Sequence, residues 1–351
     1  MAGGGHGTKA VIAALLANLG IAIAKFVGFF ITRSASMLAE GVHSVADSGN
    51  QALLLLGQRR SRREPTPEFP FGYGRERYFW AFVVALILFS LGGMFAIYEG
   101  VRKIRDPHEI QSAAVAIGIL AVAIGLEVLS FRTAVIEGRR AKAPTMTWWA
   151  FIRRSKQPEL PVVLLEDLGA LVGLVIALVA VSVSVITDNP LWDGYGTLSI
   201  GVLLVLIAVF LAVEMKSLLI GEAASTADRQ KITAAIKAEP SVTRLIHLRT
   251  QHIGPDELLV GAKLQLAPGL SIDEAVETVN RVEAKVRQAV ATVDIMYVEP
   301  DTLHSAAHSD DGAPLSRGVA LGNIPGHSAE ARGAENEPAA DGPWEDSGGV
   351  R

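Results

Sequence analysis

Four polar residues recur along one predicted membrane helix at spacings that place them on a common face. They are Glu40, His43, Asp47 and Asn50, separated by three, four and three positions. Because an α-helix has 3.6 residues per turn, these spacings put the four side chains on one side of the helix. An ionisable residue at bilayer depth costs about 2.5–3.5 kcal/mol on insertion scales, so such a line of residues must face a bundle interior or a water-filled path.

A second pair of acids, Glu166 and Asp167, lies in a later apolar segment. Adjacent residues point about 100° apart on a helix, so only one of the two can face a given partner squarely. If this helix packs against the first, His43, Asp47 and Asp167 would converge on one ion. An imidazole with carboxylate oxygens suits tetrahedral Zn²⁺, and Mn²⁺, Fe²⁺ or Co²⁺ would also accept it. The chain has no cysteine, which excludes thiolate ligands and disulfides.

A single buried His or Asp can also be a structural hydrogen-bonding residue. For His43 alone the structural and functional interpretations are balanced. With Asp47, Glu40 and Asn50 on the same face, the functional interpretation is favoured, because the insertion cost repeats with each residue. Three further ionisable residues of the apolar segments are interpreted as interfacial side chains, buried ion-pair members or water-cavity residues rather than ligands: Lys25, Glu99 and Glu127.

The composition predicts that much of the chain lies in lipid, since half of its 351 residues are hydrophobic and only 19% are charged. Crossing a hydrocarbon core takes roughly 20 apolar residues. Such stretches occur at 9–32, 36–57, 78–101, 112–131, 161–186 and 194–213. The sequence therefore predicts six transmembrane helices. The first is too long for a signal-peptide core and is followed by more spans, so we expect it to be retained.

The distribution of Lys and Arg predicts the orientation. Thirteen of them lie in the loops after the second and fourth spans, against four in the opposite loops, so the positive-inside rule places both termini in the cytoplasm. The net charge is −4 and no basic arm accompanies an aromatic platform, which argues against nucleic-acid binding. The Ala- and Gly-rich composition favours a bacterial plasma membrane, with an organellar membrane as the alternative.

After Gly221 the composition becomes that of a small soluble domain. Periodicity and turn residues predict, in order, a helix, two strands, a helix that opens on a Ser271–Glu274 capping box, and a last strand: 226–238, 245–253, 258–266, 271–290 and 294–298. This α+β unit of about 75 residues would gain stability from a partner subunit. Residues 301–351 hold nine acidic and three basic residues among many Gly, Ala and Pro, which predicts a disordered acidic tail. The predicted domains are therefore 1–221, 222–300 and 301–351.

The segment 34–48, which contains Glu40, His43 and Asp47, resembles the second-span signature of the cation diffusion facilitator family of divalent-metal/proton antiporters. The segments 69–75, 218–224 and 297–300 are also similar to family patterns, so the resemblance covers roughly residues 9–300. It implies an all-α six-helix transmembrane bundle with a small cytoplasmic α+β C-terminal domain of the ferredoxin-like (metallochaperone-like) type. It also implies a homodimer.

The chain departs from the family pattern in its fifth span. There the family carries two ligands four residues apart, and aligning Asp167 with the second places Val163 where the first belongs. One ligand is therefore missing, and Glu166, a water molecule or Asn50 would have to complete the shell. The run Leu164–Asp167 is similar to the branch that contains zinc transporter 9-like members.

The small domain gives little sign of metal binding. Lys263 and Tyr297 stand at two positions where relatives that bind regulatory zinc are expected to have histidines. Regulation by metal is therefore not expected there. The remaining histidines of this part and of the tail are not expected to be ligands either: His247, His252, His304 and His308.

The resemblance implies export of a divalent cation, Zn²⁺ before others, in exchange for protons by alternating access. It implies a metal site of His43, Asp47, Asp167 and Glu166, with Glu40 and Asn50 as auxiliary polar residues. The cation is substrate, and no tightly bound cofactor is expected. Metal ligands must be deprotonated, and an imidazole with a pKa near 6.5 can exchange metal for proton at physiological pH.

Two other classes of function are alternatives to transport. A membrane-embedded metalloenzyme would need a second His on a helix, as in His-Glu-x-x-His, and the sequence has none, so no enzyme is expected. A non-transporting scaffold or metal chaperone that has lost part of the site is the more serious alternative, because Val163 removes a ligand.

Overall fold

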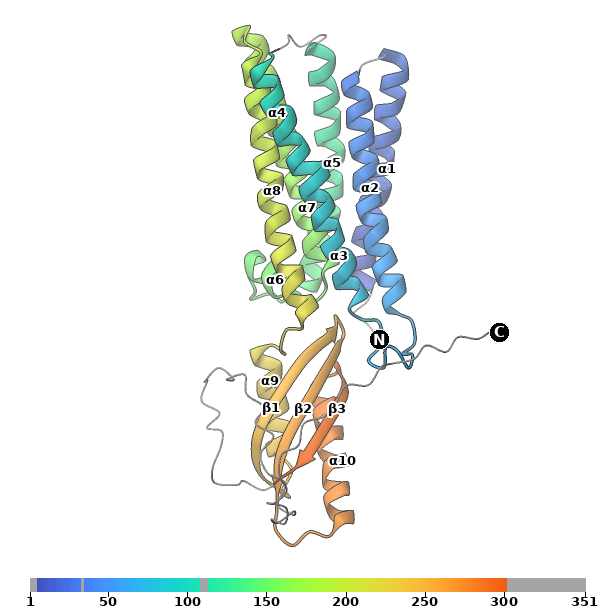
Figure 1. Ribbon diagram of the computed structural model, residues 1–351, viewed down its shortest axis with the longest axis vertical. Coiled ribbons are helices and arrows are strands. Elements are labelled where there is room, and N and C mark those ends of the chain that lie inside the picture. Colours follow the sequence, from blue (N-terminus) through green and yellow to red (C-terminus); the bar gives the residue numbers. More distant parts are fainter. Residues whose placement is uncertain (1–4, 33–34, 108–112, 302–351) are drawn as a thin grey trace, which may run out of the picture. The chain divides into compact units, whose positions relative to one another are not determined.

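The computed structural model describes residues 5–32, 35–107 and 113–301. Their first part is a bundle of long helices (Figure 1). Its elements are α1 (Gly5–Thr32), α2 (Ala35–Ser61), α3 (Glu76–Ile87), η1 (Leu88–Met94), α4 (Phe95–Arg105), α5 (Ala113–Ala141), α6 (Trp148–Arg154), α7 (Glu159–Thr187) and α8 (Leu191–Ile220). The elements α3, η1 and α4 run on as one helical segment.

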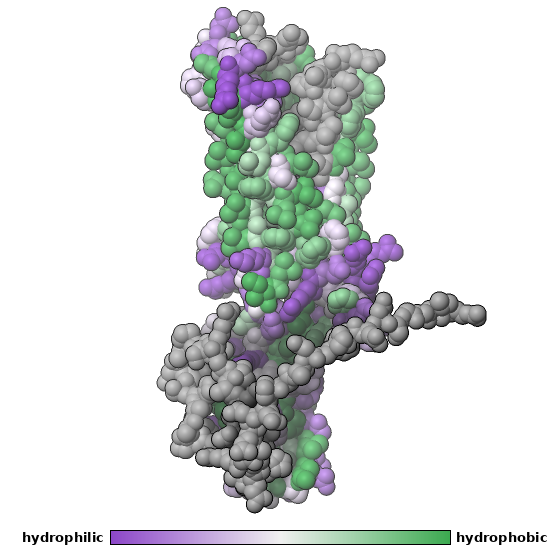
Figure 2. Space-filling model, in the orientation of Figure 1, coloured by the Kyte–Doolittle hydropathy of each residue, from purple (hydrophilic) through white to green (hydrophobic). Residues whose placement is uncertain are grey.

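Four described helical segments are long and apolar enough to cross a membrane: Glu76–Arg105, Ala114–Ala141, Glu159–Thr187 and Leu191–Ile220. They correspond to the last four predicted spans. The first two predicted spans correspond to α1 and α2. The polar residues of α2 lower the mean hydropathy of that helix. Several side chains of α1 are outside the described part of the chain. Figure 2 shows a hydrophobic surface along the middle of the bundle between polar ends, as a lipid-facing bundle requires.

Glycines allow the segment η1–α4 to lie directly against α8. A Cβ on Gly100 would lie 2.5 Å from the backbone nitrogen of Leu198, and one on Gly201 would lie 2.6 Å from that of Ile97. Small residues let helix backbones approach closely in membranes, where dispersion contacts replace the hydrophobic effect. The π-helical turn η1 contains Gly93. A Cβ added there would lie 2.6 Å from Val205 Cγ2 and 3.0 Å from the Val205 backbone nitrogen. This π-helical turn was not predicted from the sequence.

The small domain follows α8. It consists of α9 (Thr226–Lys237), β1 (Val242–Gly254), β2 (Glu257–Leu266), α10 (Ile272–Ala289) and β3 (Val293–Pro300). The sheet order is β1-β2-β3, with β1 antiparallel and β3 parallel to β2. Both helices lie on one face of the sheet (Figure 1). The core between them includes Ile232, Val260 and Val282, none of which has exposed surface. This is the predicted α+β fold.

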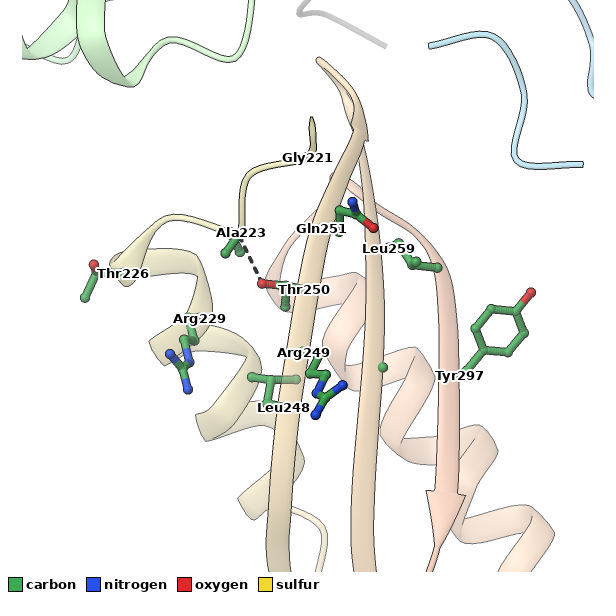
Figure 3. Close-up of a pocket in the computed structure, with 12 residues that line it drawn as sticks. Gly221, Ala223, Thr226, Arg229, Leu248, Arg249, Thr250, Gln251, Leu259 and Tyr297 are labelled. Carbon is green, nitrogen blue, oxygen red and sulfur yellow. Dashed lines mark hydrogen bonds between the residues drawn. The ribbon is translucent and has the colours of Figure 1, made fainter. Parts of the chain in front are cut away.

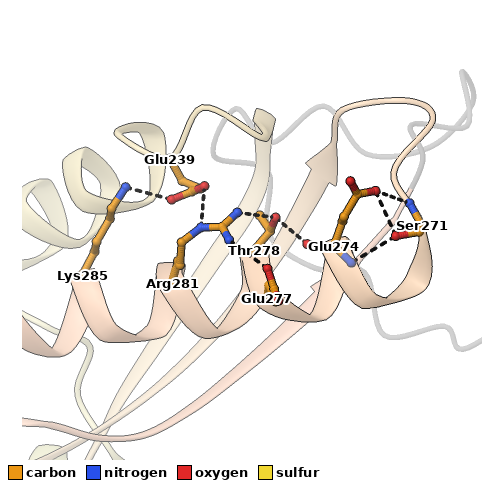
Figure 4. A network of polar contacts seen from close by, with 7 residues as sticks. All are labelled: Glu239, Ser271, Glu274, Glu277, Thr278, Arg281 and Lys285. Carbon is orange, nitrogen blue, oxygen red and sulfur yellow. Dashed lines mark hydrogen bonds and ion pairs between the residues drawn. The ribbon is translucent and has the colours of Figure 1, made fainter.

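Polar contacts fix the helices of this domain. Ser271 and Glu274 form the predicted capping box at the start of α10. Glu239, which follows α9, accepts hydrogen bonds from Lys285 Nζ at 2.8 Å and Arg281 Nε at 3.1 Å (Figure 4). The Glu239 side chain is only 3% exposed, so a buried carboxylate joins the end of α9 to the middle of α10. The predicted tail lies outside the described residues, apart from Asp301.

Candidate metal site

A small cavity of about 140 Å³ lies inside the helix bundle and is lined by four acids. Asp47 comes from α2, Glu127 from α5, and Glu166 and Asp167 from α7. The other described lining residues are apolar, small or neutral polar, and none of them is Lys or Arg. Carboxylates gathered in a low-dielectric interior repel one another unless a cation is present. The described part of this cavity is therefore suited to a cation.

Asp167 is held towards the neighbouring helix α5. Its side chain is almost completely buried, with 2% exposure. The hydroxyl of Ser130 on α5 donates a hydrogen bond of 2.9 Å to Asp167 Oδ2. This hydrogen bond holds the Asp167 carboxylate through Oδ2 and fixes its orientation. The other oxygen, Oδ1, receives no hydrogen bond from Ser130. The arrangement resembles the outer-shell hydrogen bonds that orient metal ligands.

Glu166 points instead towards amides of α2. Asn50 Nδ2 donates to Oε1 at 2.8 Å, and Gln51 Nε2 donates to Oε2 at 3.1 Å. Gln51 in turn accepts a weaker hydrogen bond of 3.4 Å from Asn18 of α1. Both carboxylate oxygens of Glu166 are therefore engaged, and the amide chain links α1, α2 and α7.

The structure brings together three of the four predicted ligands. Asp47 is half-buried and shares the cavity with Glu166 and Asp167. The side chains of His43 and Glu40 lie outside the described residues, although α2 contains both. Among the described side chains, no three His, Asp or Glu residues are already arranged to hold a metal ion. The described acids share a cavity without forming a finished coordination shell.

Val163 is fully buried in the apolar core of the bundle, one helical turn before Asp167. It cannot ligate a metal. Asn50, the auxiliary polar residue, is 2% exposed and donates a hydrogen bond to Glu166, while its own Oδ1 is buried and has no hydrogen-bond partner among the described residues. Three polar residues around this cavity were not singled out from the sequence: Asn18 in its wall, and Gln51 and Ser130 behind it. Glu127, for which a water-cavity position was one of the expected interpretations, also lines it. A sequence signal for this wall on α5 is the spacing of Glu127 and Ser130, three residues apart in the otherwise apolar stretch Ala113–Phe131.

A buried ion pair lies near the ends of two helices of the bundle. Arg77, near the start of α3, donates to both carboxylate oxygens of Glu159 at the start of α7, at 2.5 and 2.8 Å. The two side chains are 9% and 1% exposed. This fork-like pairing needs the guanidinium of Arg. The pair gives Arg77 a structural role between α3 and α7.

A larger cavity, of about 620 Å³, lies at the β1 side of the small domain (Figure 3). Its lining includes Arg229 and Arg249, and Thr250 accepts a hydrogen bond of 3.0 Å from the backbone nitrogen of Ala224. Two guanidinium groups make this cavity unsuitable for a metal cation. The basic lining of this cavity therefore distinguishes it from the acid-lined cavity in the bundle.

Lys263 is one of the two residues, with Tyr297, on which the expectation of no regulatory metal site in the small domain rests. Its ammonium group pairs with Glu299 at 3.1 Å and with Asp301 at 2.5 Å. His247 is opposite Lys263 in the register, whereas His252 is opposite Leu258, so the two histidines are on different faces of the sheet. Burial lowers the pKa of His252, and the nearby Lys156 lowers it further. His304 and His308 lie outside the described residues.

Comparison with known protein families gives two matches that together cover most of the chain. Residues 11–220 match the cation efflux transmembrane domain, and residues 224–300 match the cytoplasmic domain of cation efflux proteins. The division between the two matches follows the end of α8.

Curated proteins from animals and plants are similar over the same region. The human protein named "Proton-coupled zinc antiporter SLC30A9, mitochondrial" is 33% identical over 247 residues, which are 70% of this chain and 44% of that protein. "Metal tolerance protein C4" of Arabidopsis thaliana is 32% identical over 281 residues, 79% of this chain and 61% of that protein. The chain thus spans less than two thirds of the length of these relatives.

Among solved structures, the nickel form of a MamM CTD variant is 21% identical. The match covers 23% of this chain and all of the MamM CTD chain, with a TM-score of 0.22.

Proposed function

Because the chain belongs to the cation efflux family, the cation diffusion facilitators, whose members are transporters rather than enzymes, we propose that it exports a divalent metal cation from the cytoplasm in exchange for protons. The observation that carries the proposal is the cavity that Asp47, Glu166 and Asp167 share inside a bundle matching a cation efflux domain. Zn²⁺ is the first candidate substrate, because the human relative is named a zinc antiporter.

In the proposed mechanism, His43, Asp47 and Asp167 bind the ion, and Glu166 lies beside them. Carboxylates and imidazole hold a metal only when deprotonated, so binding a metal releases protons and adding protons releases the metal. Asp47 and Asp167 line a cavity with no described Lys or Arg, and with the imidazole proposed for His43 they would be suited to this exchange. Rocking of the helices would expose the cavity to each side of the membrane in turn.

The division of the chain at about residue 221 assigns the remaining roles. We place both termini and the small domain, residues 222–300, on the cytoplasmic side, in agreement with the excess of Lys and Arg in the loops on that side. The small domain would join two copies of the chain into a homodimer, because a unit of this size gains stability from a partner. We propose a bacterial plasma membrane as the location, with an organellar membrane as the alternative.

Transport in proteoliposomes tests the proposal. The full chain is reconstituted with a zinc-sensitive and a pH-sensitive dye inside the vesicles. We expect Zn²⁺ entry to be accompanied by proton exit, and His43→Ala and Asp167→Asn to abolish both. Asp193→Asn is the matched control, because Asp193 pairs with Lys103 at 2.7 Å and lies outside the cavity lining. Wild-type flux that survives Asp167→Asn would refute the site.

The apolar side chain of Val163 favours one alternative, a scaffold or metal chaperone that keeps the fold but does not transport. Such a protein would bind Zn²⁺ in detergent and give no flux under any proton gradient. The same vesicles therefore separate the two functions.

A further inference from the structure

The proposed cation site lacks one ligand, and the structure narrows the residues that could supply it. Val163 has no exposed surface and packs among Leu160, Leu164 and other apolar residues. Glu166 is the nearest acid in the sequence, but both of its carboxylate oxygens accept hydrogen bonds from α2 amides. A metal would have to compete with both amides to bind it with two oxygens. The missing oxygen donor is therefore better sought elsewhere in the cavity wall.

Glu127 meets the structural requirements. It lies on α5, is 6% exposed and lines the same cavity as Asp47 and Asp167. Ser130, three residues further along α5, donates the hydrogen bond to Asp167. Residues three apart share a helix face, so the face of α5 that carries Glu127 is the face turned towards Asp167.

The sequence around Glu127 makes a carboxylate at this depth costly. From Ala113 to Phe131 it is the only charged residue of α5. A buried acid in an apolar helix has to be compensated by a cation, a proton or hydrogen bonds. A divalent cation in this cavity would lie among the carboxylates of Asp47, Glu127, Glu166 and Asp167.

We propose that Glu127 is a further cation-binding residue of this cavity, supplying the carboxylate that Val163 cannot. Glu166 is then a positioning residue that holds α7 against α2 through Asn50 and Gln51. This inference rests on the proposed function. Because the described acids form no finished shell, loading of the ion draws Glu127, Asp47 and Asp167 together. A site rich in carboxylates accepts Mn²⁺ and Co²⁺ as well as Zn²⁺.

Metal binding by the full chain in detergent tests the inference without requiring transport. Co²⁺ is titrated and its visible absorption recorded, and Zn²⁺ is then used as competitor. We expect Glu127→Gln to weaken Zn²⁺ binding by at least about tenfold, since even outer-shell changes cost 10–100-fold. Glu127→Asp should restore part of the affinity. Glu127→His should shift the Co²⁺ absorption, because a nitrogen replaces an oxygen ligand, and a merely structural Glu127 would leave that spectrum unchanged.

The matched control is Glu137→Gln. Glu137 is another buried acid of α5, but it pairs with Arg140 at 2.9 Å and does not line the cavity. Zn²⁺ affinity should be unchanged in this variant. Equal affinities of Glu127→Gln and wild type would overturn the inference.

Failure of this inference is distinguishable from failure of the proposed function. If Asp167→Asn abolishes flux while Glu127→Gln keeps full Zn²⁺ affinity, the transport function stands and the role of Glu127 is refuted. If the wild type binds Zn²⁺ without flux and Glu127→Gln weakens that binding, transport is refuted and the role of Glu127 stands.

Discussion

Ser130 of α5 donates a hydrogen bond of 2.9 Å to Asp167 of α7, so the acid at the centre of the proposed site is oriented by a different helix from its own. Both residues are at most 5% exposed. The contact explains how a hydroxyl with no charge can matter to cation binding.

Ser130→Ala removes this hydrogen bond and leaves Asp167 free to rotate. We expect Zn²⁺ affinity to fall by roughly 10–100-fold, the range seen when an outer-shell partner of a metal ligand is lost. Competition against Co²⁺ measures it. Ser182→Ala is the control, because the Ser182 hydroxyl bonds only to the Leu178 carbonyl of its own helix among the contacts described. Equal affinities of the two variants would show that Ser130 does not orient the acid.

Asn50→Leu tests the link between α2 and α7. The change removes the donor to Glu166 Oε1 and leaves a buried carboxylate oxygen unpaired, which costs about 1–3 kcal/mol. The thermal unfolding midpoint of the purified full chain should fall. Ser48→Ala, also buried on α2 but bonded within its own helix, should have a smaller effect. A midpoint unchanged by Asn50→Leu contradicts the positioning role of Glu166.

The Arg77–Glu159 pair predicts a difference between single and double replacement. Arg77→Met alone leaves the Glu159 carboxylate buried without its partner, which costs about 3–5 kcal/mol. Replacing both residues, by Met and Leu, should recover most of that loss, because a buried pair often contributes little net stability. A double-mutant cycle on chemical unfolding measures the coupling. An additive double mutant would show that the two side chains act independently.

The stability of the small domain should depend on pH through Glu239. The hydrogen bond from Lys285, opposed by burial and reinforced by Arg281, lowers the pKa of the Glu239 carboxyl. A carboxyl whose pKa is lowered by folding contributes stability that is fully present above the unfolded pKa and is lost as pH falls through the folded pKa. The difference in unfolding midpoint between the wild type and Glu239→Gln should therefore be constant at neutral pH and shrink in acid, below about pH 4.

Glu283→Gln is the control for that series. Glu283 pairs with Arg287 on the surface of α10 at 2.9 Å, where solvent screens the interaction. Its effect on the midpoint should be small at every pH. A difference for Glu239→Gln that grows in acid would contradict the sign of the pKa shift.

The long helices were the most predictable part of the fold. The predicted span 161–186 falls inside α7, and the span 78–101 falls inside the segment Glu76–Arg105, because crossing a membrane requires a long apolar stretch that little else in a sequence imitates. The short helix α6 was missed. Its signal is Thr147, whose hydroxyl accepts from the Ala150 nitrogen as an N-cap.

The site was predictable only in part, because periodicity gives the face on which a residue lies but not which helix that face meets. Asp47 and Asp167, which were expected to bind one ion, line the same cavity, and their role as ligands stays a prediction. Glu127 was interpreted as an interfacial, ion-paired or water-cavity residue, and the sequence of α5 does not show that α7 is its neighbour. The roles of His43 and Glu40, and the division of the chain into domains, stay predictions.

The glycines between α4 and α8 set a limit on any motion of the bundle. At Gly100 and Gly201 one backbone meets the other with no side chain in between, so sliding either helix along its partner would drive a peptide group into a neighbouring residue. Hydrogen bonds such as those of Glu166 can break and re-form, whereas this steric fit cannot be loosened gradually. We therefore expect α4 and α8 to move as one rigid body. In the proposed transport cycle, the gate would then open along the polar contacts of α2, α5 and α7.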